Sequence, residues 1–201
     1  MAEAAAQPAI AEEDQLRASC YSLLGRLLAA PPDKTVLGVV RRLSGDETEI
    51  GQAMAALAAA ANNTTSKAIE DEYFELFIGL GQGELLPYGS YYLTGFLNEK
   101  PLARLRGDMG RLGIGRAEGV SEPEDHIAAL CEMMAGLITG AFGEPADLSV
   151  QRDFFDRHIG CWAPRFFEDL QAARSAVFYM PVGAIGRTFM AIESEAFKMA
   201  A

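Results

Sequence analysis

The amino-acid sequence predicts an all-α fold, a single-domain bundle of about nine to ten helices that spans residues 1–201. Apolar residues recur at intervals of three and four along most of the chain, which is the spacing of a helix with one buried face. No segment alternates apolar and polar residues as a half-buried strand would. The length of 201 residues suits one domain with its own hydrophobic core.

Four helices are expected in the first part of the chain. The Pro31-Pro32 pair ends the first helix, and Asp33 is the expected N-cap of the second. The third helix is rich in alanine, which has the highest helix propensity, and the fourth follows an N-cap at Thr65 or Ser66. These helices are expected over residues 16–28, 36–43, 47–61 and from the cap to residue 77.

The helical pattern fails over residues 79–90, where twelve positions contain four glycines and a proline. Large apolar side chains in this segment, such as Leu85 and Tyr88, indicate an ordered loop and not a polar linker. A helix over residues 97–112 follows. The glycine-rich connector after it, residues 113–121, is the expected hinge of the molecule.

Three segments of helical pattern remain in the last part of the chain. The first covers residues 127–141 and ends near Gly143. The second, residues 154–170, is rich in aromatic side chains, and Pro164 inside it should kink it or divide it into two helices. The last helix starts near Pro181.

The charge balance excludes some classes of partner. The 17 basic and 28 acidic residues give a formal net charge of −11, so the surface repels phosphate backbones and we expect no nucleic-acid binding. The charge would favour a basic partner, although many soluble proteins are acidic for solubility alone. No apolar run approaches the roughly 18 residues of a membrane span, so we expect no membrane insertion.

The N-terminal residues 1–14 are rich in alanine and acid and lack the basic and apolar regions of a secretory signal. We expect this segment to be disordered and the protein to be cytoplasmic. Cys20, Cys131 and Cys161 lie far apart within apolar stripes, which fits reduced, buried thiols. His158 and Cys161 alone do not make a metal site.

Signatures of catalysis and of cofactor binding are missing from the sequence. It contains no phosphate-binding loop, and the glycines of residues 79–83 do not match a dinucleotide-binding motif. It contains no Gly-x-Ser-x-Gly nucleophile motif, and a catalytic triad would have to use His126 or His158. We therefore expect a protein that is not an enzyme, with no catalytic residues, no cofactor and no metal.

Residues 121–126 place three carboxylates and a histidine before an apolar helix. The segment fits a capping box in which Ser121 and Glu124 satisfy backbone amides, with acidic side chains near the positive end of the helix dipole. The alternative is that it presents negative charge to a basic partner. Capping does not explain why Asp125 lies beside His126. The Asp125 carboxylate would raise the pKa of the His126 imidazole and the helix dipole would lower it, so the sequence leaves the direction of this pKa shift open.

Several segments, in this order along the chain, together resemble a known family. They are residues 73–79, 87–92 and 122–126, followed by an aromatic segment at residues 154–158 with Trp162 and Phe166. These segments span about half of the chain. They resemble the TorD-like and DmsD-like redox-enzyme maturation chaperones, which are related to the nitrate reductase delta-subunit assembly proteins.

The resemblance implies an all-α cytoplasmic chaperone. Members of the family bind the N-terminal, twin-arginine type signal peptide of a molybdenum-cofactor oxidoreductase and hold it until the cofactor is inserted. Some members form domain-swapped dimers through the connector, so a monomer or a domain-swapped homodimer is expected here. For this chain the resemblance implies a client-peptide surface that consists of Tyr73, Leu76, Phe77, Pro87, Tyr88, Ser90, Glu122, Asp125 and His126.

The residue types at these positions suit a signal peptide. The carboxylates before the helix could pair with two guanidiniums, and apolar side chains around Phe77 and Tyr88 could line a groove for the hydrophobic part. We expect that replacing Asp125 and His126 by alanine weakens client binding and leaves the thermal midpoint nearly unchanged. Two other functions remain open: a helical assembly subunit that stays with a non-exported redox enzyme, and a helical protein that binds a small molecule through the loop of residues 79–90.

Overall fold

The computed structural model of the protein describes residues 10–116, 119 and 121–200. Within these residues the chain forms ten α-helices and one π-helical turn and contains no strand, which confirms the predicted all-α fold. The elements are α1 (Glu12–Ala29), α2 (Lys34–Val40), α3 (Glu49–Asn63), α4 (Ser66–Tyr73), the π-helix η1 (Phe74–Ile78), α5 (Gly89–Thr94), α6 (Lys100–Leu112), α7 (Ile127–Thr139), α8 (Leu148–His158), α9 (Ala163–Ala172) and α10 (Tyr179–Met199).

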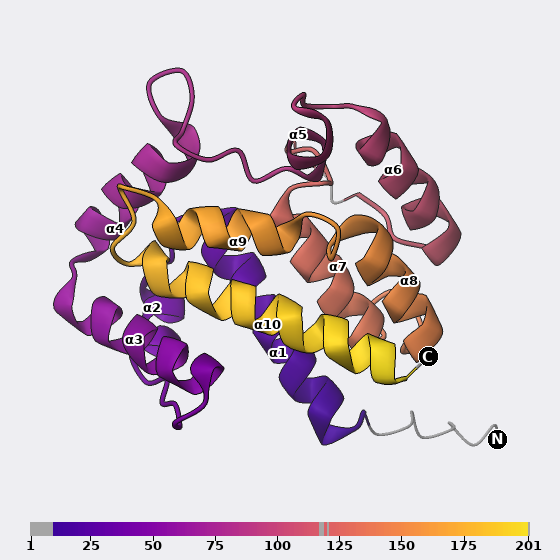
Figure 1. Ribbon diagram of the computed structural model, residues 1–201, viewed down its shortest axis with the longest axis horizontal. Coiled ribbons are helices and arrows are strands. Elements are labelled where there is room, and N and C mark those ends of the chain that lie inside the picture. Colours follow the sequence, from indigo (N-terminus) through magenta and orange to yellow (C-terminus); the bar gives the residue numbers. More distant parts are fainter. Residues whose placement is uncertain (1–9, 117–118, 120, 201) are drawn as a thin grey trace.

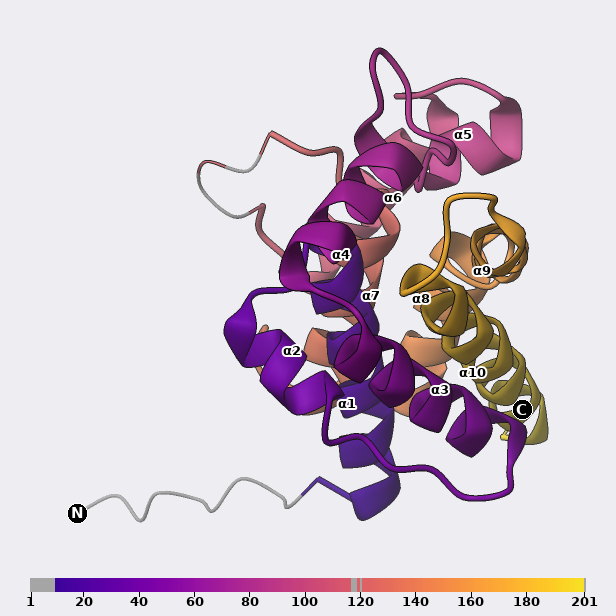
Figure 2. The ribbon, with the colours of Figure 1, turned by 90° about the vertical axis from the view of Figure 1, so that its left-hand side faces the viewer.

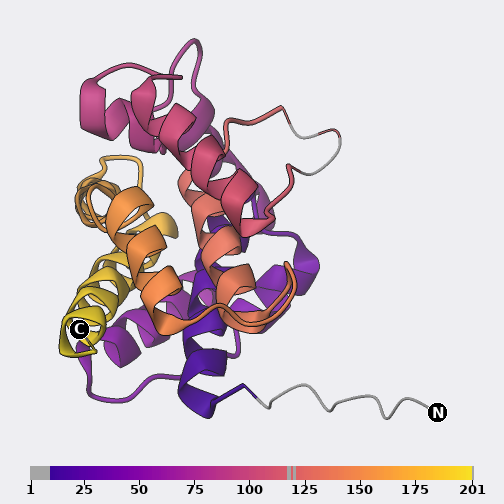
Figure 3. The ribbon, with the colours of Figure 1, turned by 90° about the vertical axis from the view of Figure 1, so that its right-hand side faces the viewer.

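The helices are arranged around α1 and α7, which pack against each other along much of their length. Figure 1 shows α9 and α10 side by side in front of α1, with α5 and α6 at one end of the molecule. Figure 2 shows α3 and α4 on one side, where α3 packs against α10. Figure 3 shows α8 beside α7 on the opposite side.

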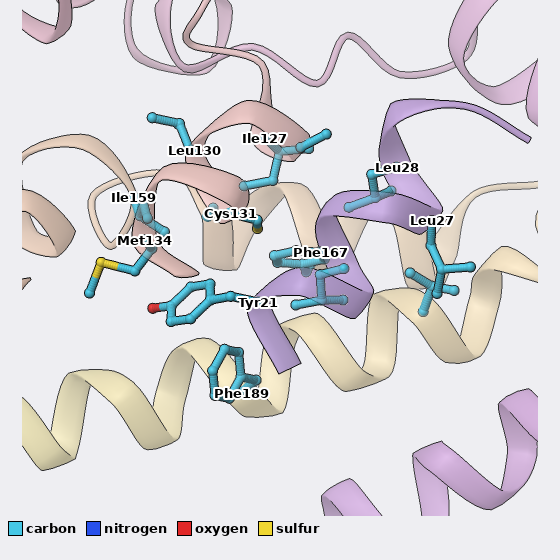
Figure 4. Close-up of a cluster of buried hydrophobic side chains, with 14 of the residues drawn as sticks. Tyr21, Leu27, Leu28, Ile127, Leu130, Cys131, Met134, Ile159, Phe167 and Phe189 are labelled. Carbon is cyan, nitrogen blue, oxygen red and sulfur yellow. The ribbon is translucent and has the colours of Figure 1, made fainter. Parts of the chain in front are cut away.

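The hydrophobic core lies between α1, α7, α9 and α10 (Figure 4). Tyr21 of α1 packs edge to face on Phe189 of α10, with 4.7 Å between the ring centroids. Cys131 of α7 and Phe167 of α9 are completely buried in the same cluster. Because each large side chain removed from water contributes about 1.5–3 kcal/mol, this cluster holds the four helices together and fixes the position of α7.

Helices α1 and α7 approach closely at Gly25. A Cβ atom at this position would lie 3.2 Å from Glu132 Cγ and 3.3 Å from the carbonyl oxygen of Ala128. Both distances are tighter than ordinary van der Waals contact, so a side chain at Gly25 would push the two helices apart. The glycine therefore brings the first turns of α7 against the end of α1.

Several predicted boundaries differ from the structure for local reasons. The loop of residues 79–90 already enters a short helix, α5, at Gly89, and the next helix, α6, starts at Lys100 and not at residue 97. The aromatic segment is divided into α8 and α9, and Pro164 lies in the first turn of α9, where a missing N–H costs nothing. The predicted fourth helix changes to a π-helical turn after Tyr73, which the apolar pattern does not reveal.

The expectation of disorder through residue 14 is wrong for Glu12, Glu13 and Asp14, which form the first turn of α1. Their carboxylates lie at the positive end of the helix dipole, which favours helix over coil. Residues 1–9 lie outside the described part of the chain. The same holds for residues 117, 118 and 120 of the connector, so its role as a hinge stays a prediction.

The structure also bears on the predictions about buried cysteines, membrane spans and metal ligands. Cys131 is buried, but Cys161 is exposed, so the prediction of buried thiols is wrong for that residue. No helix in the described part is long and apolar enough to cross a bilayer. Residues 10–116, 119 and 121–200 contain no group of three or more histidine, cysteine, aspartate or glutamate side chains placed to hold a metal ion.

Candidate functional site

Two of the family-like segments, residues 87–92 and 122–126, lie side by side in the structure, although 29 residues separate them in the sequence. The backbone N–H of Gly89 donates to the Asp125 carbonyl at 2.9 Å, and the N–H of Ile127 donates to the Pro87 carbonyl at 2.9 Å. Tyr88 and His126 form an isolated antiparallel bridge between these bonds. We call residues 87–90 and 123–127 the paired segments; they join the start of α5 to the start of α7.

Asp125 faces the interior of the paired segments and is only 3% exposed. Its Oδ2 atom accepts a hydrogen bond at 2.7 Å from the backbone N–H of Ser90, which lies in the first turn of α5. The carboxylate therefore satisfies an amide that the helix itself leaves unpaired. Asp125 is a structural cap of α5, and this position does not offer it to a client peptide.

His126 is the N-cap of α7 and is 7% exposed. Its Nδ1 atom accepts from the backbone N–H of Ala128 at 3.1 Å. Burial lowers the pKa of His126 to about 4, against the opposing effect of Glu122 and Asp125. At neutral pH the ring is uncharged, and because Nδ1 is an acceptor, Nε2 carries the proton.

The predicted capping box is wrong, because His126 and not Ser121 caps α7. Residues 121–126 remain non-helical, and their carboxylates bind other parts of the molecule. Glu124, which is 8% exposed, accepts from Nε and Nη2 of Arg106 at 3.0 and 2.8 Å, and Arg116 lies 3.5 Å away. Burial raises the pKa of Glu124, but the Arg106 hydrogen bonds outweigh it and hold the pKa below its usual value.

Glu122 differs from its two neighbours because it is exposed. Its carboxylate accepts a hydrogen bond from the hydroxyl of Tyr88, and burial together with this bond raises the pKa of that hydroxyl. The Tyr88 ring packs edge to face on His126, with 5.1 Å between centroids. The segment thus directs one carboxylate outward while it uses the other two for its own structure.

A cavity of about 290 Å³, the first cavity, lies beside the paired segments. It includes six of the nine residues predicted to bind the client, which are Tyr73, Phe77, Pro87, Tyr88, Glu122 and His126. Leu76, Ser90 and Asp125 are not part of its lining. Leu76 and Ser90 are completely buried and Asp125 is 3% exposed, so none of the three is accessible to a peptide in this structure.

Five further lining residues were not predicted, namely Ala29, Ile78, Ala128, Ala129 and Glu132. Ala29 belongs to the end of α1, which no motif marks. Ala128 and Glu132 are four residues apart on α7 and therefore lie on one face of the helix. Extending the helical spacing from the motif into α7 would have identified them.

The π-helical turn η1 shapes one wall of the first cavity. Its defining hydrogen bond runs from the N–H of Gly79 to the Phe74 carbonyl at 2.7 Å. Phe77 and Ile78 are adjacent in sequence, yet both line the cavity, and Ile78 is 52% exposed. Gly79 ends the turn with φ 61°, a left-handed conformation that glycine adopts without strain. Single π turns often occur at functional sites.

The site contains the three side-chain types of a hydrolytic triad, but not its geometry. In a triad the aspartate accepts the Nδ1 proton of the histidine, and the other ring nitrogen contacts the serine. Here Asp125 binds the backbone of Ser90, and Nδ1 of His126 is an acceptor that faces Ala128. The arrangement has no activated nucleophile and is suited to binding.

The sequence and the fold are similar to those of known proteins. The chaperone protein TorD of Vibrio cholerae serotype O1 (El Tor) is 31% identical over 140 residues, which cover 63% of this chain and 64% of that protein. The chaperone protein TorD of Aliivibrio fischeri is 28% identical over 130 residues, 61% and 60% of the two chains. The matched part thus spans less than two-thirds of these relatives' own length.

A solved structure extends the similarity to nearly the whole fold. The crystal structure of a candidate redox enzyme maturation protein from Archaeoglobus fulgidus superposes with a TM-score of 0.58 and covers 95% of this chain and 99% of that one, at 20% sequence identity. At this identity the similarity establishes the fold. The sequence profile of the nitrate reductase delta subunit matches residues 44–168, more than half of the chain and all three segments of the site. The protein belongs to the nitrate reductase delta subunit family.

Proposed function

We propose that this protein is a non-enzymatic maturation chaperone that binds the N-terminal, twin-arginine type signal peptide of a molybdenum-cofactor oxidoreductase in the cytoplasm. It holds the peptide until the cofactor has been inserted and then releases it. The observation that carries the proposal is the first cavity, where residues of three distant segments meet: Phe77, Tyr88 and Glu122 line one apolar hollow with an acidic edge.

The chemistry of the cavity matches the two parts of such a peptide. Aromatic and aliphatic walls from η1 and the paired segments would take apolar side chains, as a groove takes a peptide helix. The exposed carboxylate of Glu122 would attract guanidinium groups. Burial of two or three large client side chains contributes roughly 3–9 kcal/mol before ordering costs, whereas micromolar binding needs about 8 kcal/mol in total, so we expect the charge contacts to be needed as well.

A peptide-binding experiment tests this proposal directly. The purified full chain is mixed with immobilised N-terminal peptides of molybdenum-cofactor oxidoreductases, with the Arg-Arg pair intact or changed to Lys-Lys. We expect binding of at least one native peptide and weaker binding of its Lys-Lys form. If no such N-terminus is bound, the proposal is wrong, and copurification with a mature redox enzyme at fixed stoichiometry would indicate a permanent assembly subunit instead.

A further inference from the structure

A second cavity of about 250 Å³ lies on the other side of the same acidic residues. Apolar side chains such as Ile114, Met133 and Phe142 line it, together with the charged side chains of Arg116, Glu122, Glu124 and Glu132. Arg116 donates to the Glu122 carbonyl oxygen at 3.0 Å and lies 3.5 Å from the Glu124 carboxylate. Glu122, Ala129 and Glu132 line both cavities. The two hollows therefore share one wall, and that wall carries two carboxylates.

These two carboxylates differ from the other acids of the region in what they already bind. Glu124 and Asp125 are buried and engaged, one with Arg106 and the other with Ser90. Glu122 is exposed and accepts one hydrogen bond, from Tyr88. Glu132 is also exposed, and among the described residues its carboxylate has no hydrogen-bond or ion-pair partner.

His126 adds a hydrogen-bond donor to the first cavity. His126 lines this cavity and is 93% buried, since its exposed fraction is 7%. Its Nδ1 atom is used by the backbone of Ala128, whereas Nε2–H finds no acceptor among the described residues. The Nε2 atom is not among the fully buried unpaired atoms of the described residues, so its N–H is available to an acceptor that enters the cavity. A peptide carbonyl oxygen is such an acceptor.

We propose that the client segment crosses the first turns of α7 with an arginine side chain held between Glu122 and Glu132 and with apolar side chains in the cavities on either side. This inference rests on the proposed function and names the cation site within it. It moves that site away from Asp125 and His126, because the aspartate is committed to α5 and the histidine is a neutral hydrogen-bond donor.

A guanidinium fits this wall better than an ammonium group. Its planar fork can bind two acceptors at once, whereas an ammonium acts as a point charge. Arg106 is a nearby example of guanidinium–carboxylate pairing, since its Nε and Nη2 atoms both donate to Oε2 of Glu124. A client arginine would use Glu122 and Glu132, which line both cavities.

The test uses a synthetic peptide in which two arginines precede about twelve apolar residues, the length of a signal hydrophobic region. Fluorescence anisotropy measures its affinity for the full chain and for Glu132→Gln, Glu122→Gln and the double variant. We expect each single variant to weaken binding about three- to tenfold and the double variant more. Glu47→Gln, which removes an exposed carboxylate before α3, is the matched control and should bind like the unmodified protein.

A second peptide separates charge from shape. Citrulline in place of both arginines keeps the planar side chain and removes the charge, so this peptide should bind more weakly to the unmodified protein. With Glu122 and Glu132 both changed to glutamine, the two peptides should bind with nearly equal affinity. Thermal midpoints of all variants should agree within a few degrees, because the changed side chains are exposed.

The outcomes distinguish this inference from the proposed function. If the arginine peptide binds and the double glutamine variant still prefers it over the citrulline peptide as strongly as before, the cation site lies elsewhere and the inference is wrong, while the proposed function stands. If neither this peptide nor any native leader binds to the unmodified protein, the proposed function fails as well.

Discussion

The paired segments and the first cavity share Pro87, Tyr88 and His126, yet the two regions differ in how they use charge. In the paired segments Asp125 and Glu124 are buried and each is matched by a donor from another element. In the cavity Glu122 and Glu132 are exposed at the edge of an apolar hollow. Within one motif Glu122 thus stays exposed while Glu124 and Asp125 are used inside the fold, because Arg106 and the backbone N–H of Ser90 lie beside those two carboxylates.

A change of pH should have the largest effect on the free energy of unfolding, because it acts on buried side chains such as His126 in the paired segments. Burial lowers the folded-state pKa of His126 from 6.5 to about 4, and burial with Arg157 and Arg111 nearby does the same for His158. The unfolded chain therefore takes up protons first as pH falls, so the stabilising contribution is complete above pH 6.5 and is lost towards pH 4. We expect the free energy of unfolding to fall by about 1.5 kcal/mol through His126 between pH 6.5 and pH 5. The loss through His158 should be smaller, because its Nε2 atom lies 2.7 Å from Oδ2 of Asp108, which favours the protonated ring.

Urea denaturation at several pH values measures this loss of stability. The His126→Gln variant shows how much of the loss comes from His126. The glutamine does not titrate, so the slope of stability against pH should fall by half or more, and His158 contributes to the slope that remains. Equal slopes for the variant and the unmodified protein would mean that His126 is not protected in the folded state.

Asp125→Ala should have the next largest effect. The change leaves the N–H of Ser90 without its acceptor inside the fold and removes the cap of α5. We expect the free energy of unfolding to fall by about 2 kcal/mol, measured by urea denaturation. This replaces the sequence-based expectation of an unchanged thermal midpoint, which assumed an accessible side chain.

Glu122→Ala is the matched control for Asp125→Ala, because it removes an exposed carboxylate from the same motif. Its effect on the free energy of unfolding should stay within about 0.5 kcal/mol. If both variants lose a similar free energy of unfolding, the distinction between the buried Asp125 and the exposed Glu122 is wrong.

Ile78→Ala tests the apolar wall of the first cavity. The side chain lines the cavity and is half exposed, so its loss should weaken client binding about fivefold and hardly change stability. Leu80→Ala is the control, since Leu80 lies two residues further on, is 100% exposed and is not part of the cavity lining. If Leu80→Ala weakens binding more than Ile78→Ala, the client lies outside the cavity.

Tyr88→Phe should have the smallest effect of the set. It removes the hydroxyl that donates to Glu122 but keeps the ring that packs on His126. We expect client affinity to change by about twofold at most, because an exposed hydrogen bond contributes little. A loss of tenfold or more in the same anisotropy measurement would show that this hydroxyl orients the carboxylate for binding.

The local sequence was sufficient for most of the helices. Apolar spacing located α1, α3, α7 and α10, and Pro164 indicated where the aromatic segment divides. The resemblance of the sequence to a known family also identified six residues that line the first cavity. Helix positions depend on residues a few places apart in the sequence, and the spacing of apolar residues and the helix breakers therefore predict them directly.

The roles within the motif depended on contacts that local patterns do not contain. A capping box at Ser121 was a sound prediction for an isolated segment, but Arg106 and Ser90 bind Glu124 and Asp125 and keep the segment out of the helix. The π-helical turn that places Ile78 in the wall likewise has no signature in the apolar spacing.

The sequence by itself determined that this chain is a helical bundle with a cluster of acidic and aromatic residues near the start of one helix. Only the tertiary structure decided which of those acids are buried caps and which remain open to a partner, and it added Glu132 to the second group. The physical reason is that a carboxylate oxygen beside a donor from a distant element, such as Oδ2 of Asp125 beside the N–H of Ser90, is already engaged within the fold. Because that donor is far away in the sequence, it can be identified only from the packed structure.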